Sequence, residues 1–112
     1  KVFLAFGRAS VPATLTARTD QTITDPRRLE EELGIVRRRG FATAIDELEL
    51  GLAAIAAPVR GARGDVVAAL SVSGPTLRIT PARIAELRTI LIAEGRALSR
   101  RLGHDEQGDE AA

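Results

Sequence analysis

The sequence predicts an α+β fold of two layers, in which helices flank an antiparallel sheet. Two apolar runs, residues 53–60 and 66–73, are joined by a short loop that contains two glycines, which is typical of a β-hairpin. On either side of this hairpin, a proline preceded by a capping residue opens an amphipathic helical pattern. Because an isolated hairpin is only marginally stable in water, we expect it to belong to a sheet that the two helices cover.

The first of these helices is predicted to begin at Pro26, where Thr24 or Asp25 can cap the free N–H groups of the first turn. Gly40 is expected to end it as a C-terminal cap. Its apolar stripe recurs at positions i, i+4 and i+7 and consists of Leu29, Leu33 and Val36.

The second helix is predicted to begin at Thr80-Pro81 and to end at Gly103. Gly95 lies inside it and is expected to cost about 1 kcal/mol relative to Ala. The predicted apolar stripe consists of Ile84, Leu87, Leu91, Leu98 and Leu102. Ile90 and Ile92 lie off this stripe, and either a partner subunit or a part of the chain outside this sequence could cover them.

The remaining segments carry weaker signals. Residues 1–6 fit the end of a helix or a brief strand, and residues 7–23 fit a loop. Residues 41–50 fit a short strand followed by a loop or an irregular turn, and Pro58 predicts a strand edge or a bulge. Residues 104–112 are polar and acidic, so we expect them to be disordered. We count three or four strands and expect further strands outside this sequence, because it begins at Lys1 and contains no Met.

Composition excludes several classes of function. The 112 residues fit one domain, and 16 basic and 15 acidic residues give a net charge of +1, which argues against a strongly basic nucleic-acid surface. Three Phe are the only aromatic residues, too few for a base-stacking platform. There is no Cys, and the single His104 makes a catalytic triad or a metal site improbable, so no cofactor is expected. No membrane-spanning run or signal peptide is visible, and a cytoplasmic protein is expected.

Two hydroxyls on the second predicted strand are the most informative candidates. Side chains alternate along a strand, so Ser71 and Ser73 point to the same face, about 7 Å apart, beside Gly74. They could hold a carboxylate or carbonyl through two hydrogen bonds, although the pattern alone favours serines that face water. Their face is predicted to include Val67 and Ala69, and the opposite face to consist of Val66, Ala68, Leu70 and Val72.

Three other features each have a structural and a functional interpretation. The small residues Ala53, Ala54, Ala56 and Ala57 fit close packing of a helix on the sheet, or space for a small molecule. The acidic residues Asp46, Glu47 and Glu49 could hold a cation, but their spacing favours a solvated loop. Arginines also cluster at the predicted helix ends, in residues 27–28, 37–39 and 100–101. They fit solvated helix ends or contacts with phosphates and acidic partners.

Several segments together resemble the effector-binding domain of IclR-type bacterial transcriptional regulators. They are TITDP (22–26), EEL and VRRRGFA (within 31–42), DELELGLAAIAAPV (46–59), GDVVAALSVSGPTLRIT (64–80) and LSRRLG (98–103). The resemblance covers residues 22–103, and residues 1–6 are similar to the end of a helix in that family. It implies a GAF-like (profilin-like) domain whose sheet carries a small-molecule pocket.

The resemblance also implies a function. Domains of this family bind small organic effectors, often carboxylates or aromatic acids, and mediate dimer and tetramer assembly. Operator DNA is bound by an N-terminal winged helix-turn-helix domain that this sequence lacks, so we expect no specific DNA binding by these residues and no enzymatic activity. A ligand-independent dimerisation module is the alternative.

Five residues match effector-binding positions of the family. Ser71 and Ser73 match positions that hydrogen-bond the effector carboxylate, and Leu52 and Ala54 match positions that line the pocket. Ala44 stands where some members carry an acidic residue, which implies a less polar pocket. The segment before Ile23 is shorter than the family leads us to expect, so that wall of the pocket is expected to differ or to be absent.

Overall fold

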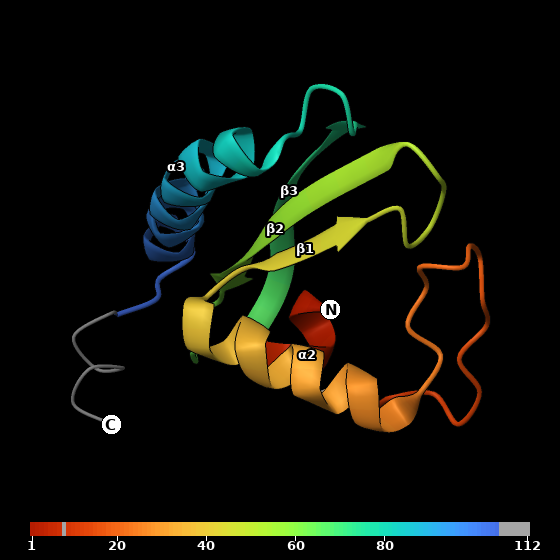
Figure 1. Ribbon diagram of the computed structural model, residues 1–112. Coiled ribbons are helices and arrows are strands. Elements are labelled where there is room, and N and C mark those ends of the chain that lie inside the picture. Colours follow the sequence, from red (N-terminus) through yellow and green to blue (C-terminus); the bar gives the residue numbers. More distant parts are fainter. Residues whose placement is uncertain (8, 106–112) are drawn as a thin grey trace.

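The computed structural model describes residues 1–7 and 9–105 and confirms the predicted α+β fold (Figure 1). A three-stranded antiparallel sheet has the order β1-β2-β3. Helix α3 covers one face of the sheet, and α1 and α2 lie on the other side. The elements are α1 (Val2–Phe6), α2 (Pro26–Arg39), β1 (Ala42–Ile45), β2 (Leu52–Arg60), β3 (Val66–Pro75) and α3 (Pro81–Arg101).

Helix α1 decides between the two interpretations of residues 1–6: they form a helix and not a strand. Residues 9–25 contain neither helix nor strand, as predicted for this segment. Thr19 and Thr22 donate side-chain hydrogen bonds to the carbonyl oxygens of Asp46 and Glu47, so the segment is tied to the turn between β1 and β2.

The predicted signals of α2 are confirmed. The Asp25 carboxylate accepts a hydrogen bond from the Arg27 N–H at 3.0 Å and caps the helix. At its other end Gly40 adopts φ 84°, and its N–H donates to the Val36 carbonyl oxygen. This left-handed conformation favours glycine. Leu29, Leu33 and Val36 are buried in a core shared with α1.

Pro58 lies in the middle strand, yet its missing N–H costs no hydrogen bond. The carbonyl of Leu52 accepts from the Asp46 N–H, so the backbone polar groups of Leu52 and of every second residue after it point toward β1. The first residue of β1, Ala42, pairs with Ala56. Because the strands are antiparallel, β1 does not extend alongside Pro58. The predicted local edge is confirmed, because β2 has no neighbour on this side at Pro58.

A β-bulge corrects the predicted faces at the start of β3. Val59 pairs with Ala68 and Arg60 pairs with Val66, which leaves Val67 as an extra residue. Val66 therefore lies on the same face as Ser71 and Ser73 and packs against the α1–α2 core. Val67 is 56% exposed. Strict alternation holds from Ala68 to Ser73, but it was wrong for Val66 and Val67.

Helix α3 begins as predicted, because the Thr80 hydroxyl accepts a hydrogen bond from the Arg83 N–H. Its predicted stripe is wrong in the C-terminal half, where Leu98 and Leu102 are exposed. The residues buried there are Gly95 and Ser99. Ile92 packs against the core of α3 and the sheet, whereas Ile90 is 52% exposed.

The structure also corrects the placement of His104 in a solvated tail. Its side chain is only 8% exposed, although the residue follows the end of α3. The disorder that we expect for residues 106–112 concerns residues outside the described part of the chain.

Candidate ligand-binding face of the sheet

The sheet brings the five predicted site residues onto one face. Ala44 pairs with Ala54, and Ala54 pairs with Ser73, so these three residues form a row across the strands. Leu52 lies two residues before Ala54 on β2, and Ser71 lies two residues before Ser73 on β3. Both therefore share this face. We name it the serine face.

The serine face is covered at one end and open at the other. Ala42 and Ala56 belong to the row of Ser71, and both contact the core that α1 and α2 form. Ser71 and Ser73 remain exposed, whereas Ala44, Leu52 and Ala54 are half-buried. The open end is therefore a shallow surface of small side chains with two hydroxyls at its border.

Neither serine hydroxyl is engaged by another described residue. Both side chains lack a hydrogen-bond partner within residues 1–7 and 9–105. Two serines on alternate strand positions place their hydroxyls about 7 Å apart, and each can donate one hydrogen bond and accept others. This arrangement can bind oxygen atoms of a ligand; in the part of the chain that the structure describes, no side chain that could act as a general base is hydrogen-bonded to either hydroxyl.

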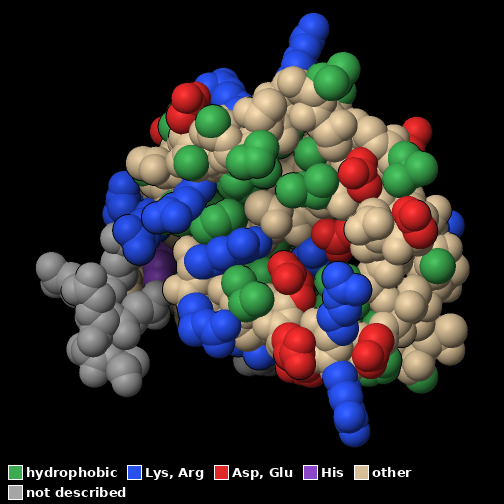
Figure 2. Space-filling model, viewed as in Figure 1, with side chains coloured by type: hydrophobic (Ala, Val, Ile, Leu, Met, Phe, Trp, Pro, Cys, Tyr) green, Lys and Arg blue, Asp and Glu red, His purple; other side chains and the backbone are tan. Residues whose placement is uncertain are grey.

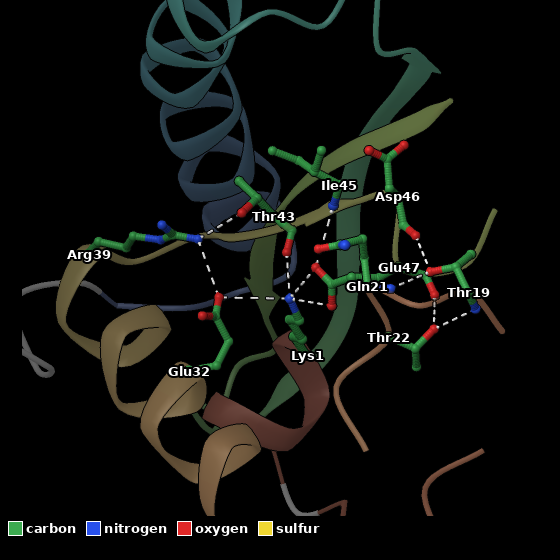
Figure 3. Close-up of polar contacts among 10 residues, drawn as sticks. All are labelled: Lys1, Thr19, Gln21, Thr22, Glu32, Arg39, Thr43, Ile45, Asp46 and Glu47. Atoms are coloured by element: carbon green, nitrogen blue, oxygen red, sulfur yellow. Dashed lines mark hydrogen bonds and ion pairs between the residues drawn. The ribbon is translucent and has the colours of Figure 1, made fainter. Parts of the chain in front are cut away.

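The acidic cluster next to this face has a structural role. The Asp46 carboxylate accepts a hydrogen bond from the Gly51 N–H at 2.7 Å, and Asp46 itself adopts φ 60°. Glu47 forms an ion pair with the Lys1 side chain at 2.7 Å (Figure 3). No group of three potential metal ligands occurs in the described part of the chain. These contacts agree with the loop interpretation of Asp46 and Glu47.

Lys1 joins this turn to β1 and α2. Its Nζ atom donates to the Thr43 carbonyl oxygen at 2.7 Å and lies 3.7 Å from the Glu32 carboxylate (Figure 3). The network fixes the position of β1 and, with it, of Ala44.

Sequence reasoning did not find a cavity that lies away from the serine face. A cavity of about 380 Å³ lies between the C-terminal halves of α2 and α3, and none of the five predicted site residues lines it. Arginines from three elements line this cavity. The sequence signal was the arginine triplet at residues 37–39, for which a solvated helix end and contacts with phosphates or acidic partners were both open, with the solvated helix end favoured.

Comparison with known proteins identifies the class to which this fold belongs. Residues 4–100 match the family model described as bacterial transcriptional regulator IclR C-terminal. The chain therefore belongs to the C-terminal domain family of IclR-type transcriptional regulators, and the expected resemblance is confirmed.

Individual relatives agree with this assignment. The HTH-type transcriptional regulator BhcR of Paracoccus denitrificans is 43% identical over 81 residues, which are 72% of this chain and 29% of BhcR. An IclR-type regulator of Silicibacter sp. TM1040 has a solved structure with a TM-score of 0.82 and 37% identity, covering 93% of this chain and 43% of that one.

A third structure is that of the inducer-binding domain of PobR from Acinetobacter, a double mutant in complex with 3-hydroxybenzoic acid. It has a TM-score of 0.69 and 33% identity, and covers 82% of this chain and 51% of that one. The chain spans about a third of the length of the curated relatives that it matches. Among the described helices, none has the length and hydropathy that a membrane span requires.

Proposed function

We propose that this chain senses a small organic acid and takes part in oligomerisation within an IclR-type regulator. The observation that carries the proposal is the pair of unengaged hydroxyls, Ser71 and Ser73, on a sheet face of small side chains. A hydroxyl that a bound ligand removes from water needs a hydrogen-bond partner, and a carboxylate supplies oxygen acceptors for both serines.

The residues beside the serines favour an apolar ligand body. Ala44 and Ala54 add only methyl groups, and Leu52 adds a half-buried apolar side chain at the border of the face. An aromatic or short aliphatic acid fits these neighbours better than a polyhydroxylated acid, because Ala44 cannot bind a hydroxyl. The 3-hydroxybenzoic acid in the PobR structure supports an aromatic acid as the first class to test.

The test compares two double variants in calorimetric titrations with benzoate, 3-hydroxybenzoate and short-chain carboxylates. Ser71→Ala/Ser73→Ala is expected to weaken binding about tenfold or more, because each lost hydrogen bond to a charged group contributes about 1.5–3 kcal/mol. Ser10→Ala/Thr16→Ala removes two exposed hydroxyls elsewhere and is expected to leave the affinity unchanged. Equal affinities in both double variants would reject the serine face as the site.

The effect of the ligand on DNA binding follows from thermodynamic linkage between effector binding and operator binding. We propose that the whole regulator binds operator DNA through a helix-turn-helix domain outside these residues, since BhcR is described as HTH-type. The effector can change DNA affinity only if it binds one arrangement of the oligomer more tightly than another. A cytoplasmic location accords with such a role.

A second candidate function is dimerisation without a ligand. Its support is the exposed apolar side of α3, where Ile90 and Leu98 are 52% and 39% exposed, together with Leu102 directly after the helix, which is 47% exposed. If α3 forms the interface, Leu98→Glu should lower the molar mass measured by light scattering. Leu77→Glu introduces the same charge at a residue that is 91% exposed and should not change the molar mass. Dimers that persist in Leu98→Glu would exclude this face.

A further inference from the structure

The cavity between α2 and α3 has an unusual charge. Within residues 1–7 and 9–105, its lining includes five arginines, namely Arg37, Arg38, Arg39, Arg60 and Arg96, and no aspartate or glutamate. Figure 2 shows basic side chains, which apart from Lys1 are all arginines in this chain, gathered in this part of the molecule, close to the single histidine. The whole chain has a net charge of only +1, so this local excess of positive charge is not a property of the composition.

Three of these arginines are held in place by neutral acceptors. Arg37 Nε donates to the Ala5 carbonyl oxygen at 2.8 Å, and Arg39 Nε donates to the Phe41 carbonyl oxygen at 3.0 Å. Arg60 donates through one terminal nitrogen to the Gly64 carbonyl oxygen at 2.8 Å. A carbonyl orients a guanidinium without cancelling its charge, and each guanidinium has further N–H groups to donate.

Carboxylates neutralise little of this charge. Glu30 lies 3.8 Å from Arg37, but both side chains are substantially exposed. Glu32 lies 3.9 Å from Arg39 and is shared with Lys1 at 3.7 Å. The exposed Glu30–Arg37 pair is weak at this distance, and the half-buried Glu32 divides its single charge between Arg39 and Lys1, so a net positive charge persists at the cavity.

The remaining two arginines are unengaged. Neither Arg38 nor Arg96 has a hydrogen bond or an ion pair through its side chain within residues 1–7 and 9–105. Arg38 lies on α2 and Arg96 lies on α3, so these two guanidinium groups reach the same cavity from different helices. Two such groups beside three anchored ones form a strongly positive site to which the described residues supply no strong negative partner.

We propose that this cavity binds a small oxyanion with two or more negative charges, either a phosphate-bearing compound or a polycarboxylate. Guanidinium groups pair with both through two parallel hydrogen bonds. The volume of about 380 Å³ suits a small molecule, and Phe6 and Ile92 offer an apolar wall to its carbon atoms. The hollow shape favours such a ligand over a nucleic acid, whose backbone needs an extended surface.

This site is distinct from the serine face. Its lining includes none of the five residues of the serine face, and the nearer lining residue of β2 on that side of the sheet, Pro58, lies four residues after Ala54, about 13 Å at the rise of a β-strand. The inference therefore does not depend on the proposed effector site. Mutations at the serine face should leave it intact.

The test titrates the 112-residue chain with pyrophosphate and with citrate by calorimetry, at low and at physiological ionic strength. One saturable site that weakens with salt is expected for at least one of them. The stronger of the two ligands assigns the phosphate or the polycarboxylate class. Benzoate, which carries one charge, is expected to bind independently of either ion.

Matched variants separate a site from a general charge effect. Arg38→Gln/Arg96→Gln should weaken the binding of the anion about tenfold or more. Arg27→Gln/Arg78→Gln removes the same charge from exposed arginines outside the cavity and should change it less than about twofold. Ser71→Ala/Ser73→Ala should leave it unchanged.

Three results would overturn the proposal. They are equal weakening in the two arginine double variants, no saturable binding of either anion at low ionic strength, and binding of duplex DNA that the anions do not compete with. Amide shift perturbations in the unmutated chain provide a check that needs no variant. They should centre on Gly40, Arg60 and Arg96 and not on Ser71 or Ser73.

Discussion

Gly95 of α3 lies so close to Pro58 of β2 that a side chain at residue 95 has no room. A Cβ atom built on Gly95 would lie 2.9 Å from the Pro58 carbonyl oxygen and 3.6 Å from the Cβ atom of Ala57. The first contact is with backbone and cannot be relieved by turning a side chain. Gly95 therefore sets the distance between α3 and the sheet.

Gly95→Ala should destabilise the domain by about 1–3 kcal/mol, because the helix must shift away from β2. Helix propensity alone predicts the opposite, a gain of about 1 kcal/mol. The measurement is the free energy of unfolding in urea. Gly34→Ala in α2 is the matched control, since its new Cβ would meet only the flexible Arg38 side chain at 3.6 Å. A stabilised Gly95→Ala would show that the close approach does not exist.

Ser99 completes the same contact between α3 and β2. Its buried hydroxyl donates to the Gly95 carbonyl oxygen at 2.7 Å and accepts from the Arg60 N–H at 2.8 Å. Ser99→Ala should cost about 1–3 kcal/mol, because the Arg60 N–H loses its partner. Thr89→Ala, at an exposed position of α3, should stay within about 0.5 kcal/mol of the unmutated chain. Similar unfolding free energies for both variants would contradict the role of Ser99.

These two residues also show where sequence reasoning failed. A search for apolar periodicity selects Leu98 and Leu102, because it ranks residues by hydrophobicity alone. The helix instead turns Gly95 and Ser99 inward, since Arg60 lies beyond the end of β1 and its N–H needs an acceptor. That requirement is set by strand pairing and is not visible in the sequence of α3.

The helices and the hairpin could be predicted because their signals are local. The cap at Asp25, the left-handed glycine at Gly40 and the alternation around Ser71 each depend on a few neighbouring residues. The arginine cavity could not be predicted in this way. Its lining residues Arg38 and Arg96 lie on two helices, and only the packing of these helices on the sheet brings them to one cavity.

The bulge in the hairpin predicts unequal roles for two adjacent valines. Val66 is half-buried against the α1–α2 core, and Val67 is 56% exposed. Val66→Ala should lower the free energy of unfolding by about 1 kcal/mol, because it removes apolar area from that core. Val67→Ala should stay within about 0.5 kcal/mol. A larger loss for Val67→Ala would mean that strict alternation continues to the start of β3.

Asp46 supports the turn that connects β1 and β2 through both its backbone and its side chain. It adopts φ 60°, which costs most residues about 1–2 kcal/mol but suits Asp and Asn, and its carboxylate accepts the Gly51 N–H. Asp46→Ala should therefore destabilise the domain by about 2 kcal/mol in urea unfolding, since it keeps the strained backbone and loses the acceptor. Asp46→Asn keeps an acceptor oxygen and should lose less than half as much. Equal losses of stability in Asp46→Ala and Asp46→Asn would contradict the role of the Asp46 side-chain oxygen as acceptor of the Gly51 N–H.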